Sequence, residues 1–348
     1  MKRALVTGAT GFIGANVARE LLARGRDVRV MARKTSDRGN LESLDVEVVE
    51  GDLRDADATS AAVKGCDEVF HVAAEYTFWS TDPEAVFASN VTGTTNVMEA
   101  CLRHGVARVV YTSTVGTIGL GGSAPPDVAR DEESPAAPDQ FTGSVYKRSK
   151  LDAERAALAF VERGLPLVVV NPSAPVGPWD RKPTPTGKII VDFMRGAMPA
   201  FLDTGLNIVH VRDVAIGHVL AAEKGRIGER YILGNRNMSL AEILGTIAKL
   251  TGRPAPRMRI PYGLAYVAGL ASTAIADRIT KRAPAVALEA VKMAKFHMYF
   301  SPAKAIRELD LPQTAPEKAF EDALAWFGER GYFTATPSRG QESRGAMT

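Results

Sequence analysis

The stretch Thr7-Gly8-Ala9-Thr10-Gly11-Phe12-Ile13-Gly14 decides the fold of this 348-residue chain. The residues before it, 3–6, are mostly apolar and predict a buried strand, and apolar residues after it recur at helical spacing. The three glycines therefore lie where a strand turns into a helix. Glycines in that place allow a tight turn, a close approach of pyrophosphate and close helix packing, and the helix N-terminus offers free N–H groups to phosphate. The stretch predicts a dinucleotide-binding site.

Apolar runs and helical stretches alternate along the first 171 residues. Strands are predicted at 27–31, 46–49, 68–72, 107–112 and 165–171, and helices at 56–63, 85–104 and 144–163. This alternation predicts an α/β fold, a Rossmann-type doubly wound parallel sheet with right-handed crossovers. Five prolines between 172 and 185 predict a loop over the crevice at the strand ends.

The chain is expected to divide near that loop. Residues 1–171 form the predicted nucleotide-binding domain, completed by a returning strand near 208–234, with 229–233 as the strand itself. Residues 172–333 form a smaller C-terminal region that mainly binds substrate, where Ser239 and Glu242 have the spacing of a capping box. The polar residues 334–348 predict a disordered tail.

Composition and residue spacing indicate which partners, location and metals to expect. The chain is 45% hydrophobic and 24% charged, and its net charge of +3 is spread along the sequence, which does not favour nucleic acid as a partner. Two cysteines, Cys66 and Cys101, in predicted interior positions and a start without a signal-peptide pattern predict a cytoplasmic location. The five histidines have no metal-ligand spacing, so no metal is expected.

One stretch is unusual, because residues 260–276 contain no charged side chain. It is short for a membrane span. The favoured interpretation is a helix that is buried or faces another subunit. The alternative is a lip over an apolar substrate that makes peripheral contact with a membrane surface over residues 260–282.

Tyr146 and Lys150 are the candidate catalytic pair. They are four residues apart on a predicted helix and so share one face. A phenol has a pKa of about 10, and a nearby ammonium group is expected to lower it. Thr112-Ser113-Thr114 ends a predicted strand at the crevice, where Thr114 is the candidate to bind a substrate oxygen, with Ser113 as competitor.

The coenzyme preference is predicted from the end of the second strand. An acidic residue normally binds the ribose 2′-hydroxyl of NAD there. This chain has Arg33 and Lys34 instead, followed by Arg38. Because basic side chains form charge-assisted hydrogen bonds with phosphate, NADP(H) is favoured over NAD(H), with Arg33 as the main contact.

Together, several motifs resemble the extended short-chain dehydrogenase/reductase family. They are Thr7-Gly8-x-x-Gly11-x-x-Gly14, Gly51-Asp52-Leu53, Asn90-Val91-x-Gly93-Thr94, Thr112-Ser113-Thr114, Tyr146-x-x-x-Lys150 and Asn171-Pro172. Within that family the chain resembles the dihydroflavonol-reductase-like branch, and most closely the hopanoid-associated sugar epimerases. The segment Val170-Asn171-Pro172-Ser173-Ala174-Pro175-Val176-Gly177-Pro178-Trp179-Asp180 is similar to theirs.

The resemblance implies a role for each matching residue. Tyr146 is the implied general acid/base, Lys150 its electrostatic support and ribose anchor, Thr114 the substrate-orienting hydroxyl, and Asn90 a residue that fixes water and helix geometry. The implied coenzyme contacts are Gly8, Gly11, Phe12 and Ile13 for pyrophosphate, Asp52 and Leu53 for adenine, Ala73 and Ala74 for the far ribose, and Thr112, Pro172, Ser173 and Ala174 around the nicotinamide. A homodimer through the helices at 85–104 and 144–163 is also implied.

Three functions remain open at this point. The leading hypothesis is an NADPH-dependent carbonyl reductase for an apolar or lipid-linked aldehyde or ketone, such as a hopanoid side chain. The first alternative is a sugar epimerase or dehydratase that retains its NAD(P); the expected glycine-flanked arginine of nucleotide-sugar enzymes is missing from residues 202–214. The second alternative is a non-catalytic NADP(H)-sensing protein, although both Tyr146 and Lys150 are present.

Overall fold

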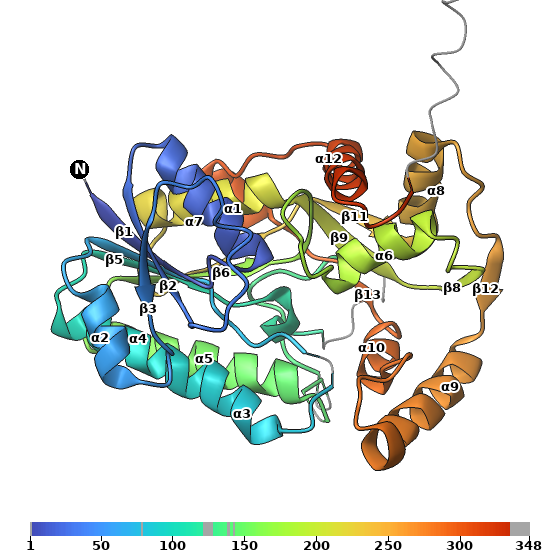
Figure 1. Ribbon diagram of the computed structural model, residues 1–348, viewed down its shortest axis with the longest axis horizontal. Helices are drawn as coiled ribbons and strands as arrows, with labels where there is room; N and C mark the ends of the chain where they lie inside the picture. The colour runs from blue at the N-terminus through green and yellow to red at the C-terminus, as the bar shows by residue number, and fades with distance from the viewer. Residues whose placement is uncertain (1, 78, 121–127, 138–139, 142, 335–348) are drawn as a thin grey trace, which may run out of the picture.

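The computed structural model describes residues 2–77, 79–120, 128–137, 140–141 and 143–334. A seven-stranded sheet organises the N-terminal half, in the order β10-β6-β5-β4-β1-β2-β3 with every neighbouring pair parallel (Figure 1). Its strands are β1 (Arg3–Thr7), β2 (Asp27–Ala32), β3 (Glu47–Glu50), β4 (Glu68–His71), β5 (Arg108–Thr112), β6 (Leu167–Pro172) and β10 (Arg230–Leu233). The predicted Rossmann-type α/β fold is confirmed.

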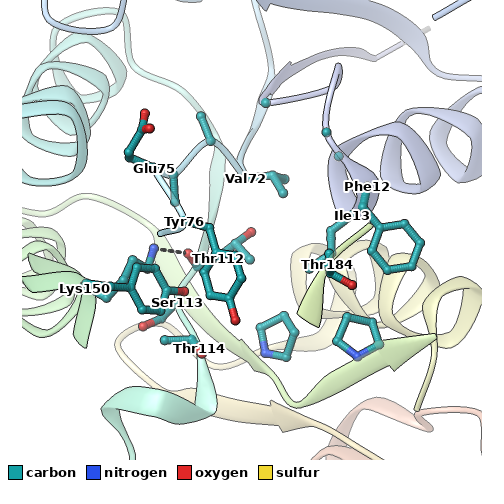
Figure 2. A pocket seen from close by; sticks show the side chains of 18 of the residues that line it. Phe12, Ile13, Val72, Glu75, Tyr76, Thr112, Ser113, Thr114, Lys150 and Thr184 are labelled. Carbon is teal, nitrogen blue, oxygen red and sulfur yellow. Dashed lines mark hydrogen bonds between the residues drawn. The ribbon is translucent and has the colours of Figure 1, made fainter. Parts of the chain in front are cut away.

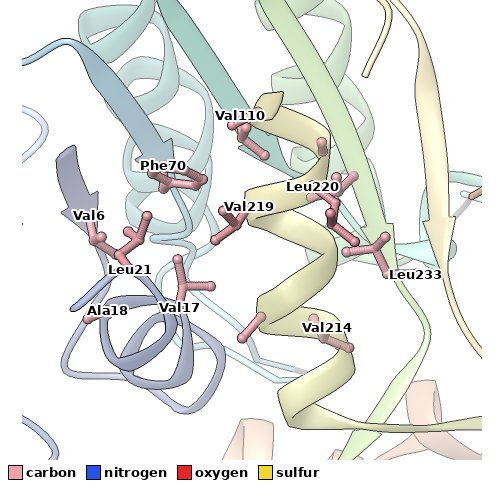
Figure 3. Close-up of a cluster of buried hydrophobic side chains, with 14 of the residues drawn as sticks. Val6, Val17, Ala18, Leu21, Phe70, Val110, Val214, Val219, Leu220 and Leu233 are labelled. Carbon is pink, nitrogen blue, oxygen red and sulfur yellow. The ribbon is translucent and has the colours of Figure 1, made fainter. Parts of the chain in front are cut away.

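Helices cover both faces of this sheet, which explains the unbroken apolar runs in its strands. One face packs on α1 (Phe12–Ala23) and α7 (Val211–Lys224), whose contact includes Val17 and Val219 (Figure 3). The other face packs on α2 (Ala56–Val63), α4 (Gly93–Arg103) and α5 (Val145–Glu162). Cys66 and Cys101 are both buried there as free thiols, as their predicted interior positions required.

The helix predicted at 85–104 forms as three consecutive segments: α3 (Pro83–Phe87), the π-helical turn η1 (Ala88–Thr92) and α4. The turn places Asn90 in the interior. Such π-helical turns are frequent at functional sites.

The C-terminal half contains a four-stranded sheet and further helices. That sheet joins β7 (Ala174–Val176), β9 (Gly205–His210), β11 (Arg236–Ser239) and β13 (His297–Met298), and a two-stranded sheet joins β8 (Ala200–Leu202) to β12 (Met258–Ile260). Its helices are α6 (Pro185–Met194), α8 (Leu240–Thr251), α9 (Tyr262–Ile275), α10 (Leu288–Met293), α11 (Ala303–Leu309) and α12 (Pro316–Glu329), with the π-helical turn η3 (Ala276–Thr280) after α9.

Sequence patterns predicted parts of this half correctly. Ser239 and Glu242 form the predicted capping box at the start of α8. The proline-rich stretch is only partly loop, because β7 forms within it and Pro185 occupies the first turn of α6, a position that proline tolerates. In the central sheet the returning strand is β10, whereas β9 pairs with β7, β11 and β13. The predicted tail lies, from residue 335 on, outside the described residues.

Most of the uncharged stretch 260–276 forms α9, which is not buried within this chain, so of the favoured interpretation only a helix that faces another subunit stays a prediction. Within this chain only Ala265 and Gly269 of that helix are buried. The helix packs on α10 with one face and leaves the other in solvent. No helix in the described ranges is both long enough and apolar enough to cross a bilayer.

Candidate active site

A cavity of about 520 Å³ opens at the carboxyl ends of β1, β4, β5 and β6. Ligands bind at this edge of open α/β sheets. The cavity is lined by the glycine turn, by Tyr146 and by Met293, Met298 and Phe300 of the C-terminal half. Figure 2 shows part of its wall, including Phe12, Thr114 and Lys150. The cavity therefore has a nucleotide end in one half of the chain and a second end walled by the other half.

The glycine turn has no room for side chains. Gly8 has φ +72°, and a Cβ there would lie 2.7 Å from Ala73 Cα. A Cβ on Gly14 would lie 2.3 Å from the Gly8 carbonyl oxygen. Gly11 is the N-cap of α1 and supplies no side chain to the free N–H groups of that helix. These exposed N–H groups at a positive helix end fit a pyrophosphate, so the turn fits a dinucleotide.

The basic residues after β2 separate into two groups. Arg33 lines the cavity, together with Ser36, which sequence reasoning missed. Lys34 and Arg38 are not among its described lining residues, and the Arg38 guanidinium binds the Glu50 carboxylate instead. Of the three predicted phosphate contacts, the structure brings only Arg33 to the cavity.

Asp52 and Leu53, the predicted adenine contacts, both line the nucleotide end. The Asp52 carboxylate accepts hydrogen bonds from Arg54, with 2.7 Å between Oδ2 and the nearer guanidinium nitrogen. This pairing lowers the pKa of Asp52 to about 2, helped by the charge of Arg33. The carboxylate is therefore ionised and close to Arg33 at neutral pH.

Tyr146 lines the cavity and is 8% exposed. Its hydroxyl group hydrogen-bonds with Thr114, and its ring packs edge-on against Tyr76 with 4.6 Å between centroids. Burial raises the pKa of Tyr146 above its usual value, and the bond with Thr114 opposes this rise. The predicted lowering by Lys150 does not appear, because that ammonium group is bonded elsewhere. Tyr146 is protonated at neutral pH.

The Lys150 ammonium group is buried beside Tyr146. It donates hydrogen bonds to the Tyr111 hydroxyl oxygen at 3.0 Å and to the Thr112 carbonyl oxygen at 2.8 Å (Figure 2 shows the latter). Burial lowers the pKa of Lys150 to about 8, and the Glu154 carboxylate partly offsets this effect. The lysine charge is therefore sensitive to pH just above neutrality.

Thr112 lines the cavity, so its predicted coenzyme contact stays a prediction. Its hydroxyl group hydrogen-bonds with His218 Nε2 of α7 at 2.9 Å. Ser113, the competitor of Thr114, contacts the Thr117 hydroxyl at 3.4 Å. Because Thr114 bonds with Tyr146 and Ser113 does not, the geometry favours Thr114 as the residue that orients a substrate oxygen.

The remaining predicted contacts divide between cavity wall and support. Those that line the cavity are Phe12, Ile13, Ala73, Ala74, Pro172, Ser173 and Ala174. Asn90 is not among the described lining residues. Its amide group accepts from the Glu75 N–H at 2.7 Å and donates to the Ser149 hydroxyl at 2.9 Å, so it joins the cavity-lining segment after β4 to α5.

Comparison with known proteins identifies the family. Residues 4–234 match the model of the NAD dependent epimerase/dehydratase family. The chain belongs to that family. It is also 44% identical over 331 residues to a Synechocystis protein provisionally named dihydroflavonol 4-reductase, covering 94% of this chain and 95% of the relative.

Two further likenesses extend over nearly the whole length of this family member. It is 38% identical over 328 residues to sterol demethylase protein B of Methylococcus capsulatus, covering 94% of this chain and 98% of the relative. The crystal structure of gox2253 superposes with a TM-score of 0.84 at 43% identity, covering 96% of this chain and 100% of that one. This epimerase/dehydratase family member is an NAD(P)-dependent oxidoreductase of the extended short-chain dehydrogenase/reductase type.

Several cavity residues of this family member have no local sequence signal. Lys147 follows Tyr146 directly, is buried and lines the cavity, and the Glu289 carboxylate of α10 acts on its charge. Glu289 also accepts a hydrogen bond from Ser144, the N-cap of α5. Residues from distant elements complete the substrate end: Thr184, Pro185, Thr186, Ile189, Leu206, Asn207, Met293, Met298 and Phe300. The tertiary fold alone brings them together.

Proposed function

We propose that this protein is an NADPH-dependent carbonyl reductase that acts on an aldehyde or ketone attached to an apolar or lipid-like molecule. The observation that carries the proposal is the chemistry of the substrate end. Among the described residues, the cavity wall from Pro172 to Phe300 has no charged side chain. A nucleoside-diphosphate sugar carries two phosphate charges, and this wall has no cationic partner for them, because the cationic residues that line the cavity, Arg33, Lys147 and Lys150, lie outside it.

The polar groups around Tyr146 suit carbonyl reduction. Thr114 and Tyr146 share a hydrogen bond at the cavity wall and present two hydroxyl groups to one substrate oxygen. Burial keeps Tyr146 protonated, which is the form that a proton donor needs. A bound nicotinamide coenzyme supplies hydride to the carbonyl carbon. Tyr146 then gives its proton to the carbonyl oxygen, and the product is an alcohol.

NADPH is the proposed coenzyme because Arg33 and Ser36 both line the nucleotide end of the cavity. A guanidinium group and a hydroxyl group both donate hydrogen bonds to a phosphate, and the guanidinium does so with charge assistance. The same position lacks the acidic residue that would repel a 2′-phosphate.

The substrate class has support from one named relative. The protein of Methylococcus capsulatus is named for sterol demethylation, and sterols are polycyclic lipids. We infer that the substrate is a terpenoid or similar lipid, with a hopanoid side-chain aldehyde as the first candidate.

A homodimer through the helices η1–α4 and α5 is a further part of the proposal. Sedimentation velocity tests it.

The deciding experiment measures coenzyme consumption with purified protein, NADPH and paired apolar and sugar aldehydes. Reduction should consume one NADPH for each alcohol formed, with apolar aldehydes preferred. Tyr146→Phe should reduce kcat by about 10²–10⁴-fold, the usual contribution of a general acid, and leave NADPH affinity unchanged. Conversion of a sugar nucleotide without net NADPH consumption would instead establish the epimerase. Full activity of Tyr146→Phe would refute the assigned proton donor.

A further inference from the structure

The helix α9 exposes an apolar face that has no partner in the described chain. Leu264, Val267 and Ile275 are 65%, 62% and 48% exposed, and Ile279 in the following turn is 75% exposed. These residues recur at intervals of three, eight and four, so they lie on one side of the helix. Residues 260–276 also have no charged side chain that could shield this face. Contiguous exposed apolar surface of this kind marks an interaction site.

The opposite face of α9 is already occupied, so the helix cannot turn its apolar side inward. A Cβ on Gly269 would lie 3.3 Å from both Leu288 and Val291 of α10, which shows how closely the two helices pack. The Ser272 and Thr273 hydroxyl oxygens accept hydrogen bonds from backbone N–H groups of the segment leading into α10. The exposed face is therefore a fixed feature of the arm formed by residues 253–295.

This arm carries more positive charge than the whole protein. It contains eight Lys and Arg and two Asp and Glu, so its net charge is +6. Because the whole chain has a net charge of +3, the rest of the chain has a net charge of −3. The exposed basic residues flank α9 on both sides in sequence: Arg257, Arg259, Arg278, Lys281, Arg282, Lys292 and Lys295. An exposed apolar helix face, flanked in sequence by exposed cations, fits a surface with an apolar interior and anionic headgroups.

The arm also borders the candidate active site. Trp79 Nε1 donates to the Asp277 carboxylate at 2.7 Å and so joins the end of the arm to the segment that carries Ala73, Ala74 and Tyr76. Met293 of α10 lines the cavity itself. Figure 1 shows α9 and α10 at the edge of the molecule, away from the central sheet.

We propose that the arm docks the protein on an anionic lipid bilayer, with the apolar face of α9 in the headgroup region. The exposed basic side chains contact lipid phosphates, and the cavity then opens beside the membrane surface. A symmetric dimer through this face is disfavoured because it would bring two surfaces of net +6 together. This inference rests on the exposed surface and charge of the arm, independently of the proposed reaction.

Vesicle co-sedimentation of the full chain tests the proposal without substrate or coenzyme, so its failure is separate from failure of the reductase assignment. One vesicle contains phosphatidylcholine only, and the other contains equal parts of phosphatidylcholine and phosphatidylglycerol. Binding to the anionic vesicle should be about tenfold stronger or more and should weaken at high salt, because each basic residue adds to the attraction.

Two variants locate the contact. L264E/V267E should reduce binding to anionic vesicles about tenfold or more. The matched control Ile227→Glu replaces another exposed apolar residue, 54% exposed and remote in sequence, and should change binding less than twofold. Circular dichroism and coenzyme affinity check that each variant folds.

Three outcomes would overturn the proposal. They are wild-type protein that binds neither vesicle, equal binding of L264E/V267E and wild type, and a wild-type dimer without vesicle binding that L264E/V267E converts to monomer. The last outcome would make the arm an interface between copies.

Discussion

The Lys150 ammonium group and the Tyr111 hydroxyl group form a buried pair with 3.0 Å between nitrogen and oxygen. Tyr111 in turn hydrogen-bonds with Thr94, whose hydroxyl lies 3.0 Å from His71 Nε2, and His71 Nδ1 lies 2.7 Å from the Thr7 hydroxyl. A continuous row of polar side chains thus joins Lys150 to the strand that leads into the glycine turn. Lys150 is held in place by β5 even without a coenzyme.

This pairing predicts how activity depends on pH. The pKa of Lys150 is about 8, so its charge is present below pH 8 and is lost above it. If that charge supports turnover, kcat/KM should fall above about pH 8. Tyr111→Phe removes an acceptor that favours the charged lysine, so the alkaline limb should move to lower pH. An unchanged limb in Tyr111→Phe, measured by pH–rate profiles, would contradict this role of the pair.

Coenzyme preference should depend on Arg33 rather than on its basic neighbours. Arg33→Ala should weaken NADPH binding about 10- to 100-fold, the value of one or two charged hydrogen bonds, and change NADH binding less than twofold. Fluorescence titration measures both. Arg38→Ala is the matched control, because that side chain binds Glu50, and should leave both affinities unchanged. Equal loss of NADH and NADPH affinity in Arg33→Ala would show a general rather than a phosphate-specific contact.

Two glycine substitutions should affect different properties: Gly14→Ala should abolish coenzyme binding, and Gly245→Ala should stabilise the fold. Gly14→Ala would place its Cβ 2.3 Å from the Gly8 carbonyl oxygen, so it should displace the turn and abolish coenzyme binding. Gly245→Ala lies in α8, where an added Cβ meets nothing within 4 Å. It should raise the free energy of unfolding by about 0.5–1 kcal/mol, since alanine loses less entropy in a helix. Denaturant unfolding and coenzyme titration of the two variants distinguish these outcomes; retained binding in Gly14→Ala would refute the steric argument.

Two buried histidines should make the fold sensitive to acid. Burial lowers the pKa of His71 to about 3 and that of His218 to about 4. The unfolded chain takes up protons near pH 6.5 while the native state does not, so stability is lost as pH falls below that value. Between pH 7 and 5 each histidine should contribute a loss of about 2 kcal/mol. Asp180, with a pKa raised to about 6 by burial, works in the opposite direction and offsets about 1 kcal/mol.

Denaturant unfolding at pH 7, 6 and 5 measures this loss. His218→Gln should flatten the pH dependence, whereas His104→Gln, at a half-buried position, should keep it. If the free energy of unfolding of the wild type does not change between pH 7 and 5, the predicted acid sensitivity from the two histidines is wrong.

Local sequence patterns predicted the parts of the site that local structure builds. The glycine turn needs a strand, three spaced glycines and a helix, and all three signals lie within about twenty residues. Tyr146 and Lys150 were found because one helix carries both. Their spacing did not reveal that Lys150 bonds to Tyr111, because β5 is contributed by residues 39 positions earlier. Ser36 and Met293 were missed for the same reason, since neither has a local motif.

The exposure of α9 shows a second limit of sequence patterns. An uncharged run normally predicts burial, because apolar side chains gain free energy on leaving water. Whether a partner covers every side of a helix depends on tertiary packing. Here α10 covers only the side with Ala265 and Gly269.

The place of β10 in the central sheet has a consequence for synthesis of the chain. β10 pairs with β6, although 57 residues separate Pro172 from Arg230. Until the ribosome has delivered residues 230–233, the outer edge of β6 has no partner strand, and until α7 emerges, Val17 and Leu21 of α1 lack part of their apolar cover. Nascent chains that stop within residues 173–210 therefore present an open parallel edge and an uncovered apolar face, the two features that promote aggregation. The sheet that carries the glycine turn is therefore completed only after residues 173–229, which include β7, α6, β8 and β9 of the C-terminal half, have been made.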